Sequence, residues 1–299
     1  MRTSASIAVV VRSRPRRYVA LLVAVSLLGV TGVAGATTWA VSVISGTNPA
    51  EAQSKVFNAP TGGAAATPKS TSLVISWSAP SGGATPTGYQ VQRNGAAVPS
   101  GSGCYGTIAT TTCTDTALAA NTGYTYGVVA LVGTNWKSAV SSTFVGTTNA
   151  TFVVTAITST NAPGNTVGMM GVGDTFAVTF NYPVNPSTIN TVAGSSTITL
   201  VGSGNSTTIA VSGLTSASGF GVTSNYEKSG NTSTGAGTLS LSNSNTTVTF
   251  TVTGGLTNTG NIKTGSPSTF TFVPLSTIAD TNGDTAATSY NQSVALQIF

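Results

Sequence analysis

Apolar and polar positions follow two different patterns in this chain, and the change between them falls near residue 50. Residues 18–50 form a continuous run of 33 uncharged residues. Beyond it, large apolar residues recur at every second position of short runs, as in residues 73–77 and 176–180. Such alternation places every second side chain on one face of an extended strand, which predicts half-buried β-strands. No helical periodicity follows residue 50, so we expect an all-β body.

The N-terminal pattern predicts an export signal. Five of the eleven basic residues precede residue 18, and residues 18–33 are almost entirely apolar. A cationic segment stays on the cytoplasmic side while an apolar segment enters the bilayer. Small residues at positions 34 and 36 suit signal peptidase, so we expect cleavage after Ala36. The alternative is an uncleaved transmembrane anchor in residues 18–44, because about 20 apolar residues span a bilayer. Both interpretations place the rest of the chain outside the cytoplasm.

The alternating runs fall into two groups, which predict two domains after a signal peptide or anchor (residues 1–36) and a linker (residues 37–56). The first domain covers residues 57–148, and Asn149-Ala150 is a short joint. In the first domain we expect strands at residues 72–77, 88–93, 124–130 and 138–145. Asn94-Gly95 follows the second of these strands, and this dipeptide is a strong hairpin signal because both residues tolerate positive φ.

Specific residues of the first domain resemble the fibronectin type III family. Trp77 matches the core tryptophan of the second strand, and Gly88-Tyr89-x-Val91 matches the third. Residues 118–130, with Tyr124 and Tyr126, match the region in which a tyrosine hydroxyl bonds back to the preceding loop. Ala120 stands where the family usually has proline. The resemblance implies an Ig-like β-sandwich of about ninety residues.

The second domain, residues 151–299, contains seven or more short strands separated by Gly, Ser and Asn loops, which indicates a second sandwich. The clearest strands lie at residues 176–180, 197–200, 239–241, 248–252, 270–272 and 294–298. Three stretches, residues 173–180, 182–186 and 278–284, resemble the bacterial Ig-like domains of surface-layer and adhesin proteins, the SbsA-type family. Residues 216–237 resemble an insertion into that pattern. The fold we expect is therefore two tandem Ig-like sandwiches.

The charge of the mature chain excludes several classes of function. Beyond Ala36 six basic residues stand against six acidic ones, scattered along the sequence. Nucleic-acid binding requires clustered Lys and Arg, so we expect none. The chain has no histidine, which removes the commonest general base, and no serine lies in a nucleophile-elbow motif. We expect no enzyme activity, no cofactor and no resident metal.

Three groups of residues are candidates for local chemistry. Cys104 and Cys113, the only cysteines, are expected to form a disulfide outside the cytoplasm. Residues 280–284 place two aspartates and an asparagine around Gly283, which indicates either a turn or a weak calcium site. Trp136, in the loop before the last strand of the first domain, either packs on the sandwich edge or contacts a ligand.

These observations predict an exported, non-enzymatic protein with a structural or adhesive role at the cell surface. Its partner is expected to be a cell-wall or glycan polymer or a protein, with self-association possible through the apolar last strand. One alternative is a carbohydrate-binding accessory module that exposes Trp136, Tyr105 or Tyr226 on one face. The other is a self-assembling matrix or fibre subunit.

Overall fold

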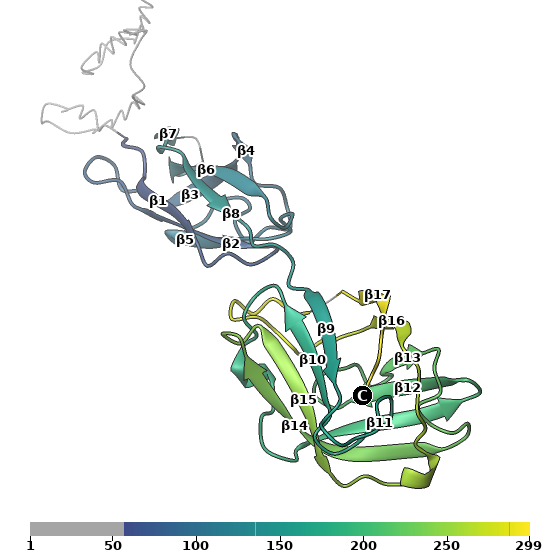
Figure 1. The fold of residues 1–299 in the computed structure, drawn as a ribbon. Helices are drawn as coiled ribbons and strands as arrows, with labels where there is room; N and C mark the ends of the chain where they lie inside the picture. Colours follow the sequence, from purple (N-terminus) through teal and green to yellow (C-terminus); the bar gives the residue numbers. More distant parts are fainter. Residues whose placement is uncertain (1–56, 135, 287) are drawn as a thin grey trace, which may run out of the picture.

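The computed structural model describes residues 57–134, 136–286 and 288–299, and the regular elements in these ranges are β-strands and two 3₁₀ turns. Two separate hydrophobic clusters form, one from residues 57–130 and one from residues 152–299. The fold is therefore all-β with two cores, and Figure 1 shows the two corresponding units joined between β8 and β9. The predicted signal or anchor helix and the linker before residue 57 lie outside the described residues.

The first unit packs two antiparallel sheets around its core. One sheet has the order β1-β2-β5, and the other has the order β4-β3-β6-β7 with β8 also paired to β6. The strands are β1 (Thr61–Ala66), β2 (Leu73–Ser78), β3 (Gly88–Arg93), β4 (Ala96–Ala97), β5 (Thr112–Asp115), β6 (Gly123–Val132), β7 (Trp136–Val140) and β8 (Phe144–Thr147). Trp77 is 5% exposed and packs edge-on against Tyr89 with the ring centroids 5.4 Å apart.

Two predicted turns of the first unit have the expected chemistry. Asn94 and Gly95 both have positive φ, 52° and 80°, and connect β3 to β4. The Tyr124 hydroxyl accepts a hydrogen bond from the backbone N–H of Ala119 at 2.8 Å. This is the tyrosine bond to the preceding loop that the fibronectin type III resemblance implies, and it forms although Ala120 replaces the usual proline.

The edge strand predicted over residues 138–145 is divided in the structure. β7 pairs with the C-terminal half of β6 and β8 with its N-terminal half. The hydroxyls of Ser138, within β7, and Ser141, just after it, accept hydrogen bonds from the N–H groups of Ala130 and Val128 at 2.9 and 3.0 Å. Side-chain oxygens thus replace strand carbonyls as acceptors, and a continuous ladder is interrupted.

In the residues that the structure describes, the second unit contains nine strands. They are β9 (Val154–Thr160), β10 (Thr175–Phe180), β11 (Ser196–Ser203), β12 (Ser206–Val211), β13 (Phe220–Val222), β14 (Thr232–Ser242), β15 (Thr247–Gly254), β16 (Ser268–Phe272) and β17 (Tyr290–Leu296). Seven of them form one antiparallel sheet in the order β13-β12-β11-β14-β15-β10-β9, and β16 and β17 form a two-stranded ribbon. Residues 216–237 supply β13 and the start of β14, so the segment that resembled an insertion is part of the sheet.

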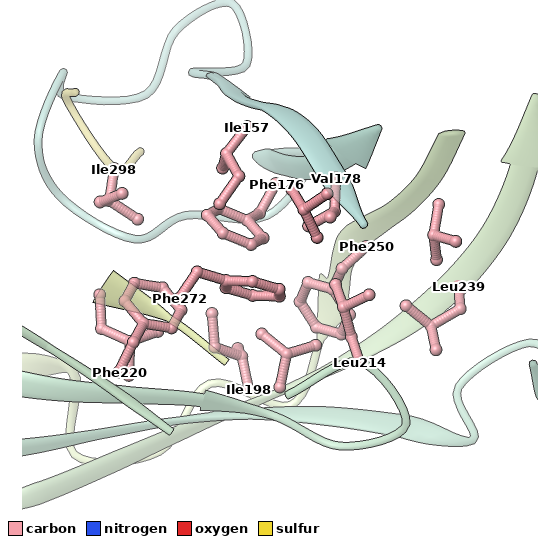
Figure 2. Packing of buried hydrophobic residues seen from close by; sticks show 14 of the residues in the cluster. Ile157, Phe176, Val178, Ile198, Leu214, Phe220, Leu239, Phe250, Phe272 and Ile298 are labelled. Atoms are coloured by element: carbon pink, nitrogen blue, oxygen red, sulfur yellow. The ribbon is translucent and has the colours of Figure 1, made fainter. Parts of the chain in front are cut away.

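The seven-stranded sheet curls around its own core. Phe176 on β10 and Phe220 on β13 stack at a centroid distance of 5.5 Å. Five strand spacings separate these two strands in the sheet, which would be about 24 Å if the sheet were flat. Figure 2 shows Phe272 of the ribbon lying between Phe176 and Phe220. The two walls of this sandwich-like unit are therefore two ends of one sheet.

A glycine on β14 permits that curl. The β14–β15 register shifts between Ala236 and Gly237. A Cβ atom at Gly237 would overlap the ring of Phe250 and lie 2.7 Å from the carbonyl oxygen of Thr251. Since glycine has no side chain, the fully buried Phe250 ring lies against the backbone at this bulge and closes the core between the two walls.

Candidate functional site

The two cysteines are joined in the expected disulfide. Cys104, in the loop after β4, bonds to Cys113 on β5, with their Cα atoms 5.2 Å apart. The loop is held further by Ser102, whose hydroxyl accepts a hydrogen bond from the N–H of Cys104 at 3.1 Å. A nine-residue separation corresponds to about 2.5 kcal/mol of stabilisation in the chain-entropy account. The bond is structural, and no free cysteine remains in the described chain.

A buried polar cluster adjoins the disulfide loop. Asp115 at the end of β5 is fully buried, and Arg93 on β3 pairs with its carboxylate at 3.0 Å. The hydroxyls of Ser102 and Tyr126 donate to the same carboxylate at 2.7 and 2.9 Å. Burial first, and then this hydrogen bond, raise the pKa of Tyr126. The sequence carried one signal of the cluster, because Arg93 shares an alternating face with Tyr89 and Val91 and so needs an internal partner.

The three candidate contact aromatics are not displayed together as a binding face. Tyr105 is 58% exposed, and Trp136 is half-buried as the first residue of β7, paired with Val132, rather than in a loop. The expectation for Tyr226 is wrong, because this side chain is fully buried in the second core. Its hydroxyl donates to the carbonyl of Ser266 and accepts from the N–H of Ile298, both at 3.0 Å, and burial raises its pKa.

The turn at residues 280–284 uses its first aspartate internally. The buried carboxylate of Asp280 accepts hydrogen bonds from the N–H groups of Asn282 and Asp284 at 2.8 and 2.9 Å. Gly283 has a φ of +82°, as a glycine-centred turn requires. These contacts are those of the turn interpretation rather than of a calcium loop.

The second aspartate of this turn contacts the first unit. The backbone N–H of Ser70 donates to one oxygen of the Asp284 carboxylate at 2.6 Å, and the Ser70 hydroxyl donates to the other at 3.0 Å. The two residues are 214 positions apart in the sequence. This pair links the two units directly. Hydrogen bonds to a carboxylate are stronger than those between neutral groups, so the link is a strong one.

The chain segment between the units is fixed from both sides. The amide of Asn149 donates to the carbonyl of Pro68 in the first unit at 2.8 Å, and the N–H of Ala150 donates to the Tyr182 hydroxyl of the second unit at 3.3 Å. We call these residues together with the preceding pair the joint. The joint consists of Pro68, Ser70, Asn149, Ala150, Tyr182 and Asp284. The sequence located Asn149-Ala150, but nothing in it indicated that residues 280–284 meet Ser70.

Other kinds of site are not found in the part of the chain that the structure describes. Within residues 57–134, 136–286 and 288–299, no three His, Cys, Asp or Glu side chains gather in a group that could hold a metal. A search of the same residues yields no helix whose length and hydropathy would let it cross a membrane.

The geometry therefore defines a class of protein, two β-sandwich units held by a polar joint, with a disulfide in the first. Comparison with protein families agrees for the first unit, since residues 58–144 match the model of the fibronectin type III domain. A search of curated proteins finds no match.

Solved structures give weak global likenesses. A two-domain fibronectin type III segment of chicken tenascin is 13% identical over 78% of this chain and 97% of its own, with a TM-score of 0.25. A chitinase from Bacillus thuringiensis is 18% identical over 69% of this chain and 25% of its own, with a TM-score of 0.25. A family 28 exopolygalacturonase from Yersinia enterocolitica is 18% identical over 31% of this chain, with a TM-score of 0.27, and the chain spans only 20% of it.

Proposed function

We propose that this chain is an exported, non-enzymatic structural or adhesive module that holds two sandwich surfaces in a set arrangement outside the cytoplasm. Three observations support the extracellular setting: the export pattern before residue 50, the Cys104–Cys113 disulfide and the fibronectin type III match. Its partner is a cell-wall or glycan polymer or a surface protein.

The joint is the observation that carries this proposal. Residues from both units take part in it, and its strongest contact uses a carboxylate that a loose linker would leave in water. Three further carboxylates, those of Asp115, Asp174 and Asp280, are fully buried and hydrogen-bonded within their own units. These four aspartates thus serve the architecture, which favours a presenting module over acid–base catalysis.

The second unit is, in this proposal, a bacterial Ig-like domain of the SbsA type. The supporting features are β10, which ends in Phe180 and leads directly into Pro183 and Val184, and the glycine-centred turn at residues 280–284 before β17. In this chain the same turn also supplies Asp284 of the joint, so a feature shared with that family holds the two units together.

The adhesive role is tested by retention of the purified chain on cell-wall sacculi and on insoluble polysaccharides. Trp136→Ala is compared with Tyr105→Ala, because these aromatics differ in exposure and lie on different elements of the first unit. Retention of the parent chain on one polymer, lost in one variant and kept in the other, supports the proposal and locates the contact. Absence of retention on every wall and glycan polymer contradicts a polymer-binding role.

Self-assembly is a second candidate, favoured by one observation. Val294 on β17 is 72% exposed, and in the described chain β17 is hydrogen-bonded as a strand to β16 alone. An unpaired edge with an exposed apolar side chain is a template for pairing with another copy. Light scattering over a concentration series decides this: growth in mass that Val294→Lys abolishes supports assembly, and a monomer at every concentration excludes it.

A further inference from the structure

One acidic side chain of the second unit has no partner for its charge among the residues that the structure describes. Glu227, between β13 and β14, is fully buried, and neither of its carboxylate oxygens receives a hydrogen bond from the described residues. The side-chain oxygen of Asn225, two positions earlier, is also buried and without a donor. A three-residue segment therefore holds three enclosed acceptor oxygens without a donor in the described chain.

The backbone at Glu227 is fixed in this enclosed position from several sides. The N–H groups of Tyr226 and Glu227 both donate to the hydroxyl of Thr207, at 2.9 and 3.1 Å. Glu227 also forms an isolated bridge with Ile262. On another side lies Gly202, where an added Cβ would be 2.6 Å from the carbonyl oxygen of Glu227. Because neighbouring segments hold its backbone this closely, Glu227 has a fixed place in the interior of the second unit.

An ionised carboxylate in such a place requires a counter-charge. Removing an unpaired charge from water costs several kcal/mol or more, so buried charges in native proteins are paired, bound to metal or neutralised. The second unit contains only two basic residues, Lys228 and Lys263. Both are exposed, and neither makes an ion pair with Glu227 in the described chain. The described part of the chain therefore offers no cation here.

We propose that Glu227 and Asn225 belong to a buried binding site for a calcium ion. All three orphaned atoms are oxygens, and hard cations prefer carboxylate and amide oxygens, whereas transition metals favour nitrogen and sulfur. Calcium also accepts backbone carbonyls and water, so a site does not need three acidic side chains. Calcium is a cation that extracellular modules bind at concentrations of about 0.1–1 mM. Calcium bound at Glu227 stabilises the second unit, independently of what the sandwich surfaces contact.

The test is thermal unfolding of the full chain in chelator and then across a calcium series, with isothermal titration calorimetry on the chelated protein. We expect the unfolding of the second unit to move upward by several degrees at saturating calcium. Magnesium should act more weakly, because it demands tighter octahedral geometry. Glu227→Gln keeps the shape without the charge, and it should fold and lose both the shift and the binding heat. Asp284→Asn, at the joint, should keep both.

A second variant tests the site through an expected gain in calcium affinity. Asn225→Asp adds a charge to the proposed ligand set and should lower the calcium concentration at half-maximal shift. If calcium changes neither the melting temperature of the parent chain nor the heat measured by calorimetry, the proposal is overturned. If Glu227→Gln is then at least as stable as the parent, a proton is the partner that neutralises Glu227. A calcium response that Glu227→Gln leaves unchanged also overturns it, because the ion would bind elsewhere.

Discussion

At the residue scale, the inside of the first unit is organised by one carboxylate. Asp115 serves Arg93, Tyr126 and Ser102 at once. Removing it in Asp115→Ala leaves a guanidinium and two hydroxyls without their partner, so we expect the free energy of unfolding to fall by about 3–5 kcal/mol. Tyr126→Phe removes one hydrogen bond from the same carboxylate and should cost about 1–2 kcal/mol. Urea denaturation at neutral pH measures both, and equal losses in the two variants would contradict a network centred on Asp115.

The same cluster predicts how stability depends on alkaline pH. The pKa of Tyr126 is raised in the folded protein, chiefly by burial and then by the Asp115 carboxylate. Because the pKa of Tyr126 is higher in the folded than in the unfolded protein, this tyrosine stabilises the fold fully below the unfolded-state pKa of about 10. That stabilisation is lost as the pH rises further. The melting temperature should therefore fall above about pH 10, and less steeply in Tyr126→Phe. Parallel curves for parent and variant would show that this tyrosine is not responsible.

At the element scale, the curl of the seven-stranded sheet depends on backbone without a side chain. Gly237→Ala forces a methyl group into the Phe250 ring and toward the Thr251 carbonyl, so we expect a loss of about 2–3 kcal/mol in the free energy of unfolding. Gly221→Ala on β13 is the matched control, because nothing lies within 4 Å of its added Cβ. Its effect should stay within about 0.5 kcal/mol. Similar losses in both variants would indicate strand propensity rather than the curl.

At the scale of the whole molecule, the sequence predicts the strands well and their assembly less well. Alternation located β2, β3, β10 and β15, because it depends only on which residues face a core. For the second unit the sequence predicted a sandwich of two sheets, whereas seven of its strands share one sheet. Alternation does not record which strands are hydrogen-bonded to each other. The contact between Phe176 and Phe220 is what reveals one curled sheet.

The sites divide in the same way. The disulfide was predictable because the chain has only two cysteines and an export signal. The environment of Tyr226 was not, because an aromatic side chain between polar neighbours is equally compatible with a surface and with a core. Glu227 was visible only as one acid in a loop, and its burial depends on Gly202 and Thr207, which lie twenty or more positions away.

The joint leads to a prediction about the arrangement of the two units. Asp284→Ala removes both hydrogen bonds to Ser70 and keeps those of the Asn149–Ala150 segment. We expect each unit to stay folded, while the distance distribution between one spin label on each unit becomes broader. The reason is that interfaces of this polar kind restrain domains only as long as their specific contacts persist.

Asn282→Ala is the control, because its side chain lies in the same turn and does not contact Ser70 among the described residues. It should keep the narrow distribution of the parent, and Ser70→Ala, which keeps the backbone N–H bond, should lie between parent and Asp284→Ala. A parent distribution as broad as that of Asp284→Ala would mean that the units reorient freely and that the joint does not set their arrangement. In that case the relative orientation of the two sandwich units would be set only when both bind the same partner.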